Sequence, residues 1–216
     1  MNMIPYNIAV LITSFVILLT GCRINNKVDT TSTQTEVRTL LAGTDKTIIT
    51  PEVVETWTDV DGDYKYSPDK DIYIDRNGNG CFDAVWLAGF HEARPAMGIH
   101  DDLWARSVVI ENNGVRVAIV ALDLIGFFYN HVQEIRSEIP RELKIDYVII
   151  TSTHTHSGPD TIGIWGFSHE ESGFDPVYLE FLKRQIVSSI IRATKRLKPA
   201  HLYVAMKEGL TKDVIS

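Results

Sequence analysis

Residues 105–122 read ARSVVIENNGVRVAIVAL, and this stretch decides the fold class. Segments 105–110 and 115–122 are apolar and rich in β-branched residues, which favours two strands. The pair Asn113-Gly114 lies between them and is typical of a tight hairpin turn. The second segment is apolar on both faces over most of its length, so it predicts a buried central strand.

The chain after this hairpin predicts a βαβ unit. Residues 129–143 carry apolar side chains at helical spacing, and Pro140 predicts a kink or a short break there. Residues 147–152 (YVIITS) again favour a buried strand. A strand, a helix and a strand over about 40 residues form a right-handed unit with parallel strands.

A longer helix is predicted next. Asp175 and Pro176 suit its N-cap and first position, one face stays apolar, and Pro199 ends it. Residues 200–206 (AHLYVAM) predict a further strand. The predicted fold class is therefore α/β, with a mixed sheet, a βαβ unit and flanking helices.

The N-terminus carries a predicted export signal. The apolar run at residues 8–19 is too short to cross a bilayer core about 30 Å thick, and it has the length of a signal-peptide h-region. The motif LTGC follows at residues 19–22 and resembles the lipobox of bacterial lipoproteins. The resemblance implies a signal peptide over 1–21, cleavage before Cys22 and lipidation of Cys22. The alternatives are an uncleaved anchor, or secretion with a chance cysteine.

The segment after the lipobox predicts a spacer. Residues 22–46 are rich in Thr, Asn and Gln at first and lack apolar periodicity there, which predicts a flexible tether to a domain over 47–216. The anchor would hold that domain at the bacterial cell envelope, on the outer membrane or the cell surface. The formal net charge of −7 argues against sequence-independent nucleic-acid binding, which needs a clustered positive surface.

Residues 59–83 form an acidic insertion with calcium-ligand spacing. Residues 75–83 (DRNGNGCFD) place oxygen side chains and a glycine as the opening of an EF-hand-type loop does. Trp86 stands where that loop has its bidentate Glu, so a shorter, structural calcium turn is predicted. The candidate calcium ligands are Asp59, Asp61, Asp63, Asp75, Asn77, Asn79 and Asp83. The alternative is a hydrophilic loop whose Asp and Asn residues favour turns.

The strand predicted at 147–152 leads directly into THTHSGP at residues 153–159. Ligands bind just beyond the carboxyl ends of strands in open α/β sheets. His154 and His156 alternate along an extended segment, so their rings should share one face, and neutral imidazole is a good Zn²⁺ ligand. Two surface histidines are the alternative interpretation.

THTHSGP at the end of a buried strand resembles the neutral/alkaline non-lysosomal ceramidases. Two upstream blocks resemble the same family in order and spacing, GIHDDLWARS at residues 98–107 and VAIVALDLIG at residues 117–126. The resemblance covers roughly residues 85–210. It implies the N-terminal part of a larger ceramidase-like catalytic domain, carried here by a bacterial lipoprotein.

The resemblance also implies a zinc-dependent amidase that cleaves ceramide or a related lipid-like substrate. His154 matches a zinc ligand of the family, and His156 matches a residue that contacts the substrate or the reacting centre. The other family ligands (a His, a Glu and a Tyr) lie farther downstream, and no residue here matches them.

Two functions are therefore expected as alternatives. One is an exported, lipid-anchored hydrolase in truncated form. The other is a non-catalytic, calcium-stabilised surface lipoprotein module or an inactive fragment. A third interpretation, a metallophosphoesterase- or deacetylase-like site, needs Asp123 and His154 to share metals.

Overall fold

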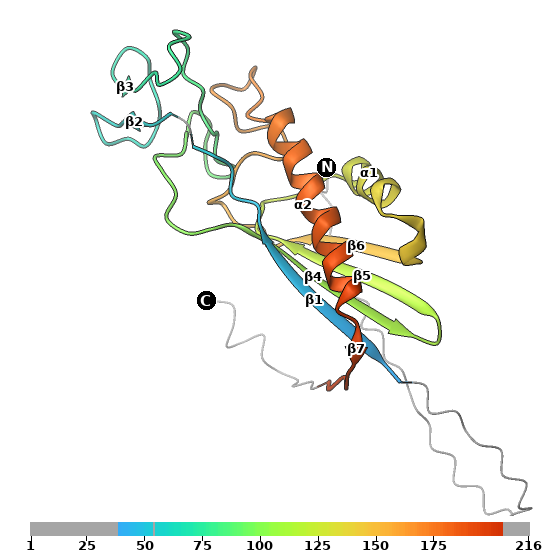
Figure 1. The fold of residues 1–216 in the computed structure, drawn as a ribbon. Helices are drawn as coiled ribbons and strands as arrows, with labels where there is room; N and C mark the ends of the chain where they lie inside the picture. The colour runs from blue at the N-terminus through green and yellow to red at the C-terminus, as the bar shows by residue number, and fades with distance from the viewer. Residues whose placement is uncertain (1–38, 54, 205–216) are drawn as a thin grey trace, which may run out of the picture. The chain divides into compact units, whose positions relative to one another are not determined.

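The computed structural model describes residues 39–53 and 55–204 (Figure 1). The predicted signal peptide at residues 1–21, the lipidation site Cys22 and most of the predicted tether lie outside the described residues. No described helix has the length and apolar character needed to cross a bilayer.

The described chain forms a mixed sheet, a small second sheet and flanking helices. The elements are β1 (Leu41–Ile48), β2 (Trp57–Thr58), β3 (Ile72–Tyr73), β4 (Trp104–Asn112), β5 (Val115–Leu122), α1 (Tyr129–Glu138), the 3₁₀ turn η1 (Arg141–Leu143), β6 (Tyr147–Ser152), α2 (Pro176–Lys195) and β7 (Lys198–Pro199). The main sheet has the order β6-β5-β4-β1-β7, and β2 pairs with β3. Only the β5–β6 pair of the main sheet is parallel. The predicted α/β class with a mixed sheet is confirmed.

β4 and β5 form the predicted hairpin. Asn112 pairs with Val115, and the two residues between them have positive φ, 56° at Asn113 and 78° at Gly114. Two consecutive positive φ values define the type I′ turn, whose twist matches that of the strands. The Asn-Gly pair therefore sets the register of the central strands.

α1 connects β5 to the parallel strand β6, which confirms the predicted βαβ unit. The helix ends at Glu138, and Ile139 and Pro140 are extended before the η1 turn. A proline disfavours the helical conformation in the residue that precedes it. The helix predicted over 129–143 is thus interrupted at the predicted break.

α2 packs across one face of the main sheet (Figure 1). Asp175 accepts a hydrogen bond from the backbone N–H of Val177 at 2.7 Å, and Pro176 stands in the first turn, as predicted. The buried apolar side chains of α2 in the core are Tyr178, Leu182, Ile186, Ile190 and Ala193. Ile135 of α1 belongs to the same core, so both helices cover the same face.

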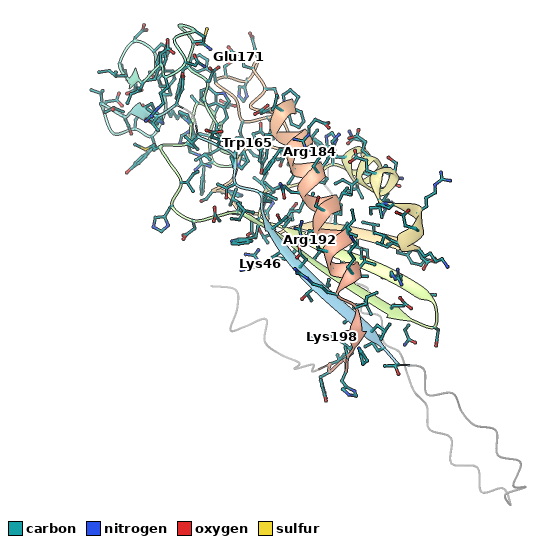
Figure 2. The ribbon with its side chains drawn as sticks, viewed as in Figure 1. Lys46, Trp165, Glu171, Arg184, Arg192 and Lys198 are labelled. Atoms are coloured by element: carbon teal, nitrogen blue, oxygen red, sulfur yellow. The ribbon has the colours of Figure 1, made fainter. Side chains whose placement is uncertain are left out.

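β1 begins at Leu41, inside the segment 22–46 that was expected to be tether. That boundary was wrong because the strand depends on partners far along the chain. Asp45 is paired with Arg192 of α2, which is labelled in Figure 2 and lies 2.8 Å away, and with Arg196. Gly43 lies against the end of α2. Local sequence patterns do not record such contacts.

The strand predicted at 200–206 does not form over its described part. β7 covers only Lys198–Pro199, and residues 200–204 have no regular secondary structure. Leu202 and Tyr203 are exposed, by 70% and 88%. Apolar composition favours a strand only where a layer is present to bury it.

Candidate functional site

The histidine motif follows β6 at the carboxyl edge of the main sheet. The backbone N–H of Thr153 donates to Leu122 at 2.9 Å, and that of His154 donates to Leu124 at 3.0 Å. These bonds continue the β5–β6 pairing beyond the strands. The motif is therefore held against the residues that follow β5, at the edge where ligands bind in α/β sheets.

A backbone carbonyl oxygen orients the ring of His154. Its Nδ1 lies 2.8 Å from the carbonyl oxygen of Ile125. Because a carbonyl oxygen only accepts, Nδ1 carries the proton, and the Nε2 atom of the neutral ring keeps its lone pair. Metal-ligating histidines commonly donate their other N–H in this way. His154 is exposed, and its φ of 63° lies in the left-handed region.

The ring of His156 lies beside that of His154, with centroids 5.2 Å apart and planes at 70°. The His156 ring also lies against that of Phe90, with centroids 4.9 Å apart and planes at 75°. Gly89 has a φ of 83°, and a Cβ there would lie 2.5 Å from the His156 ring. The structure thus brings both predicted histidines together. Gly89 and Phe90 pack closely against the ring of His156.

Arg94 is a site residue that sequence reasoning missed. Its Nη2 donates to the carbonyl oxygens of Ala88 at 2.5 Å and His156 at 2.6 Å. The guanidinium lies 5.1 Å from the ring centroid of Phe90. Burial lowers the pKa of Arg94. No local pattern in its segment distinguishes this arginine from a surface residue.

Asp160 shapes the chain just after the motif. It is 1% exposed, and its carboxylate accepts the backbone N–H groups of Ile162, Gly163 and Trp165 at 2.7–2.9 Å. A buried carboxylate with several backbone donors fixes a loop firmly. This residue was also not predicted.

A cleft of about 550 Å³ borders the motif. Its polar lining includes Asp123, Thr155 and Ser157, and its apolar lining includes Met97 and Leu103. Sites for small molecules are typically concave and mostly apolar, with a few polar groups. This cleft has that character.

Asp123 is paired with an arginine side chain and not with the histidines. Arg106 Nη1 lies 2.8 and 2.7 Å from its two carboxylate oxygens, and the backbone N–H of Trp104 donates to it at 3.0 Å. Among the described residues, no group of three candidate metal ligands includes Asp123 or His154. The geometry therefore gives no support to a metal shared by these two residues.

In the first half of the acidic insertion, Asp59 and Asp61 come together with Asp71. One carboxylate oxygen from each lies within 4.8 Å of the others, so the three could hold a cation. Lys70 lies 2.7 Å from Asp61, and its hydrogen bond lowers the pKa of that carboxyl. Asp63 instead accepts a backbone hydrogen bond. Asp71 was missed because it lies outside the alternating DVDGD pattern.

Hydrogen bonds between its own residues hold the second half of the insertion together. Both oxygens of Asp75 accept backbone N–H groups, at 2.6 and 2.9 Å. The side-chain amides of Asn77 and Asn79 donate to Asp83 at 2.6 and 2.8 Å. Glu55 is fully buried and accepts two backbone N–H groups from this loop. Glu55 is a further organising residue that the sequence did not reveal.

Comparisons with known proteins match the region that holds this site. A family model described as "Neutral/alkaline non-lysosomal ceramidase, N-terminal" matches residues 79–214. The neutral ceramidase of Pseudomonas aeruginosa is 34% identical over 124 residues, which cover 51% of this chain and 18% of that protein. Neutral ceramidase B of Dictyostelium discoideum is 29% identical over 157 residues, 68% of this chain and 21% of that protein.

A solved structure agrees with the fold. The crystal structure of neutral ceramidase from Pseudomonas aeruginosa superposes with a TM-score of 0.51 at 23% identity, covering 75% of this chain and 22% of that one. The chain thus spans about a fifth of the length of the relatives it matches.

Proposed function

Because this chain belongs to the neutral/alkaline non-lysosomal ceramidase family, we propose that it is the N-terminal part of a ceramidase-like hydrolase. The proposed reaction is hydrolysis of the amide bond of ceramide or a related lipid-like substrate. The family match over residues 79–214 includes the hairpin, the βαβ unit and the histidine motif.

The observation that carries this proposal is the hydrogen bond between His154 Nδ1 and Ile125. It orients the ring and leaves Nε2 available to a metal ion, which fits the zinc that the family resemblance implies. A bound Zn²⁺ supplies a Lewis acid that polarises a carbonyl and lowers the pKa of water. A catalytic zinc rests on three protein ligands as a rule, and His154 is the one that we assign here.

His156 is the proposed catalytic residue of this chain. Its ring lies beside that of His154, and Arg94 donates a hydrogen bond to its backbone carbonyl oxygen. An imidazole in this place can orient a substrate or move a proton near neutral pH. The cleft beside the motif, with Leu87, Met97 and other apolar residues in its lining, suits the aliphatic part of a lipid-like substrate.

Two further parts of the proposal concern binding outside this centre. The hard oxygen ligands of Asp59, Asp61 and Asp71 suit Ca²⁺, which would stiffen the acidic insertion. The lipobox-like motif ending at Cys22 would anchor the chain to the bacterial envelope.

The test measures metal and turnover in the purified full chain. We expect stoichiometric zinc by elemental analysis, lost in His154→Ala and retained in His201→Ala, an exposed histidine outside the motif. Release of fatty acid from a fluorescent ceramide is the matching activity readout. A chain without zinc and without turnover would contradict the hydrolase proposal for this polypeptide.

A second candidate is a non-catalytic, calcium-stabilised surface module. One observation favours it: within the described residues, the grouped acidic ligands are those of the insertion. Calcium-dependent stabilisation without ceramide turnover would support this candidate.

A further inference from the structure

The acidic insertion and strand β2, just before it, pack against the loop at residues 87–98. Trp57 Nε1 donates a hydrogen bond to the carbonyl oxygen of Pro95 at 3.2 Å, and the backbone N–H of Tyr66 donates to the carbonyl oxygen of Ala93 at 2.7 Å. The same loop contacts the histidine motif through an aromatic ring and a guanidinium. One loop therefore joins the insertion to the candidate site.

A groove of about 520 Å³ lies between the insertion side and this loop. We call it the aromatic groove. Its aromatic and aliphatic lining residues are Trp57, Tyr64, Leu87, Phe90, Pro95 and Met97. Pockets for small molecules in proteins have this size and this largely apolar character.

The polar side chains of the aromatic groove are His91 and Arg94, and both bond the backbone. His91 Nδ1 lies 2.8 Å from the carbonyl oxygen of Glu92. Arg94 Nη2 donates to three carbonyl oxygens, and the guanidinium lies 5.1 Å from the ring centroid of Phe90. The groove therefore favours an uncharged, apolar ligand over an anion.

Two aromatic residues of the groove are exposed and have an unfavourable backbone conformation. Tyr64 is 66% exposed with a φ of 61°, and Phe90 is 77% exposed with a φ of 63°. The left-handed region is rare for bulky side chains and costs free energy. The backbone N–H of Tyr64 donates to Asp59 at 2.9 Å, which supports this conformation. Strained residues of this kind cluster at ligand-binding sites.

The aromatic groove adjoins the cleft beside the histidine motif. Leu87, Met97 and Gly98 line both cavities. Phe90 of the groove also packs against the ring of His156, with centroids 4.9 Å apart. A molecule whose reacting bond lies at the histidine motif can therefore extend an apolar chain along this shared wall into the groove.

We propose that the aromatic groove binds the distal part of one linear aliphatic chain of the substrate, and that Tyr64 selects for chain length. This inference rests on the proposed function, because a lipid-like substrate supplies the chain. Each methylene group that leaves water for an apolar pocket adds affinity, so a chain that reaches Tyr64 binds more tightly than one that ends in the cleft. Trp57 and Tyr64 precede the segment at residues 79–214 that the family model matches. The selection therefore depends on a wall outside that segment.

The experiment measures chain binding without any hydrolysis. The probe is a glycerol monoalkyl ether with a long linear chain and a diazirine near the end of that chain. It has no amide or ester bond, so neither zinc nor turnover affects the result. The full chain is titrated with the probe below its micelle concentration, and cross-links formed on illumination are located by mass spectrometry. We expect saturable binding, with cross-links at Tyr64, Phe90 or Met97.

Chain length and variants at Tyr64 test the selection. A short-chain ether should bind at least roughly tenfold more weakly than the long-chain ether. Tyr64→Gly should weaken binding of the long chain by about the same factor without lowering the melting temperature, because glycine adopts a φ of 61° without strain. A merely structural tyrosine would instead lower the melting temperature when it is removed.

Two further variants are controls. Tyr64→Phe keeps the ring and should keep wild-type binding. Tyr129→Ala removes a tyrosine of matched exposure, 67%, on α1 and outside the groove, and it should also leave binding unchanged.

Three results would overturn the inference. The first is no saturable binding of the long-chain ether to the folded wild-type chain. The second is equal binding by the wild-type chain and by Tyr64→Gly. The third is cross-linking confined to another cavity, such as the one lined by Val177 and Phe181. Ceramide turnover without ether binding would overturn this inference and keep the proposed function, whereas ether binding without turnover would support the groove and contradict the hydrolase.

Discussion

Arg94 and His156 are 62 residues apart in sequence, yet Nη2 of the arginine donates to the carbonyl oxygen of the histidine at 2.6 Å. The same nitrogen also donates to the carbonyl oxygens of Ala88 and Gly89. The guanidinium of Arg94 therefore connects the loop at residues 88–94 to the histidine motif. The backbone beneath the imidazole is therefore fixed by a residue that does not itself face the cleft.

Replacing Arg94 by Ala should destabilise the protein by about 2–3 kcal/mol, because several carbonyl oxygens lose their donor. The imidazole resonances of His156 should also shift in NMR spectra. Arg94→Lys should give an intermediate result, since Lys keeps the charge but not the planar fork. Urea unfolding measures the stability. The control is Arg184→Ala on the exposed side of α2 (Figure 2). Wild-type stability in Arg94→Ala would contradict this role.

His154→Ala and His154→Gly form a pair that separates metal binding from backbone strain. Both remove the imidazole, so both should lose zinc equally. The Gly variant should be more stable by about 1 kcal/mol, because the φ of 63° is unfavourable for a residue with a Cβ. Thermal unfolding of the metal-free variants checks this difference. Equal stability would show that the position is not strained.

Two glycines should respond to substitution for different reasons. Gly43→Ala would bring a Cβ to 2.1 Å from the backbone oxygen of Ala193, so we expect a loss of about 3 kcal/mol from overpacking. Gly114→Ala meets open space but keeps a φ of 78°, so the loss should be only about 1 kcal/mol. Denaturant unfolding of both variants measures the contrast, and the reverse order would contradict it.

The ion pair between α1 and α2 predicts a pH dependence. A hydrogen bond from Lys183, 3.0 Å away, lowers the pKa of Glu134 from its ordinary value of 4.5. A lowered carboxyl pKa stabilises the fold at pH values above the ordinary one, and this gain is lost as pH falls through the folded-state pKa. The stability difference between wild type and Glu134→Gln should therefore be present at neutral pH and disappear in acid.

Glu138→Gln provides the control for this pH series, because Glu138 is also exposed on α1. Unfolding free energies of the three proteins between neutral and acidic pH make the comparison. A difference between wild type and Glu134→Gln that grows in acid would contradict the assignment.

Calcium should stabilise the acidic insertion through Asp59, Asp61 and Asp71. We expect millimolar Ca²⁺ to raise the melting temperature of the wild-type chain, and Asp59→Asn or Asp71→Asn to remove the response. Asp101→Asn, at an exposed carboxylate outside the insertion, should keep it. If Ca²⁺ still raises the melting temperature of Asp59→Asn, the cation binds at another site.

The parts of the fold that could be predicted are those with local signals. Asn113-Gly114 indicates its hairpin directly, and Pro140 marks the break after α1. β1 could not be predicted in the same way, since its Asp45 is stabilised by Arg192 at the far end of α2. The contacts that stabilise β1 join residues far apart in the sequence, so they leave no periodic pattern in its own residues.

The candidate site shows the same division. His154 and His156 are conspicuous because they alternate directly after a buried strand. Arg94 and Asp160 act through backbone groups that only the folded chain brings to them. Residues that hold a site in place have ordinary sequence surroundings, so their roles become visible only in three dimensions.

The position of β1 in the sheet has a consequence for the order of folding. Leu41 pairs with Glu111 on one side and with Pro199 on the other, so the first strand of the described residues needs partners that are synthesised much later. Contacts of such long sequence separation slow folding, whereas the β4–β5 hairpin closes locally. We expect the sheet to assemble outward from that hairpin, with β1 secured only after the polypeptide through Pro199 has left the ribosome.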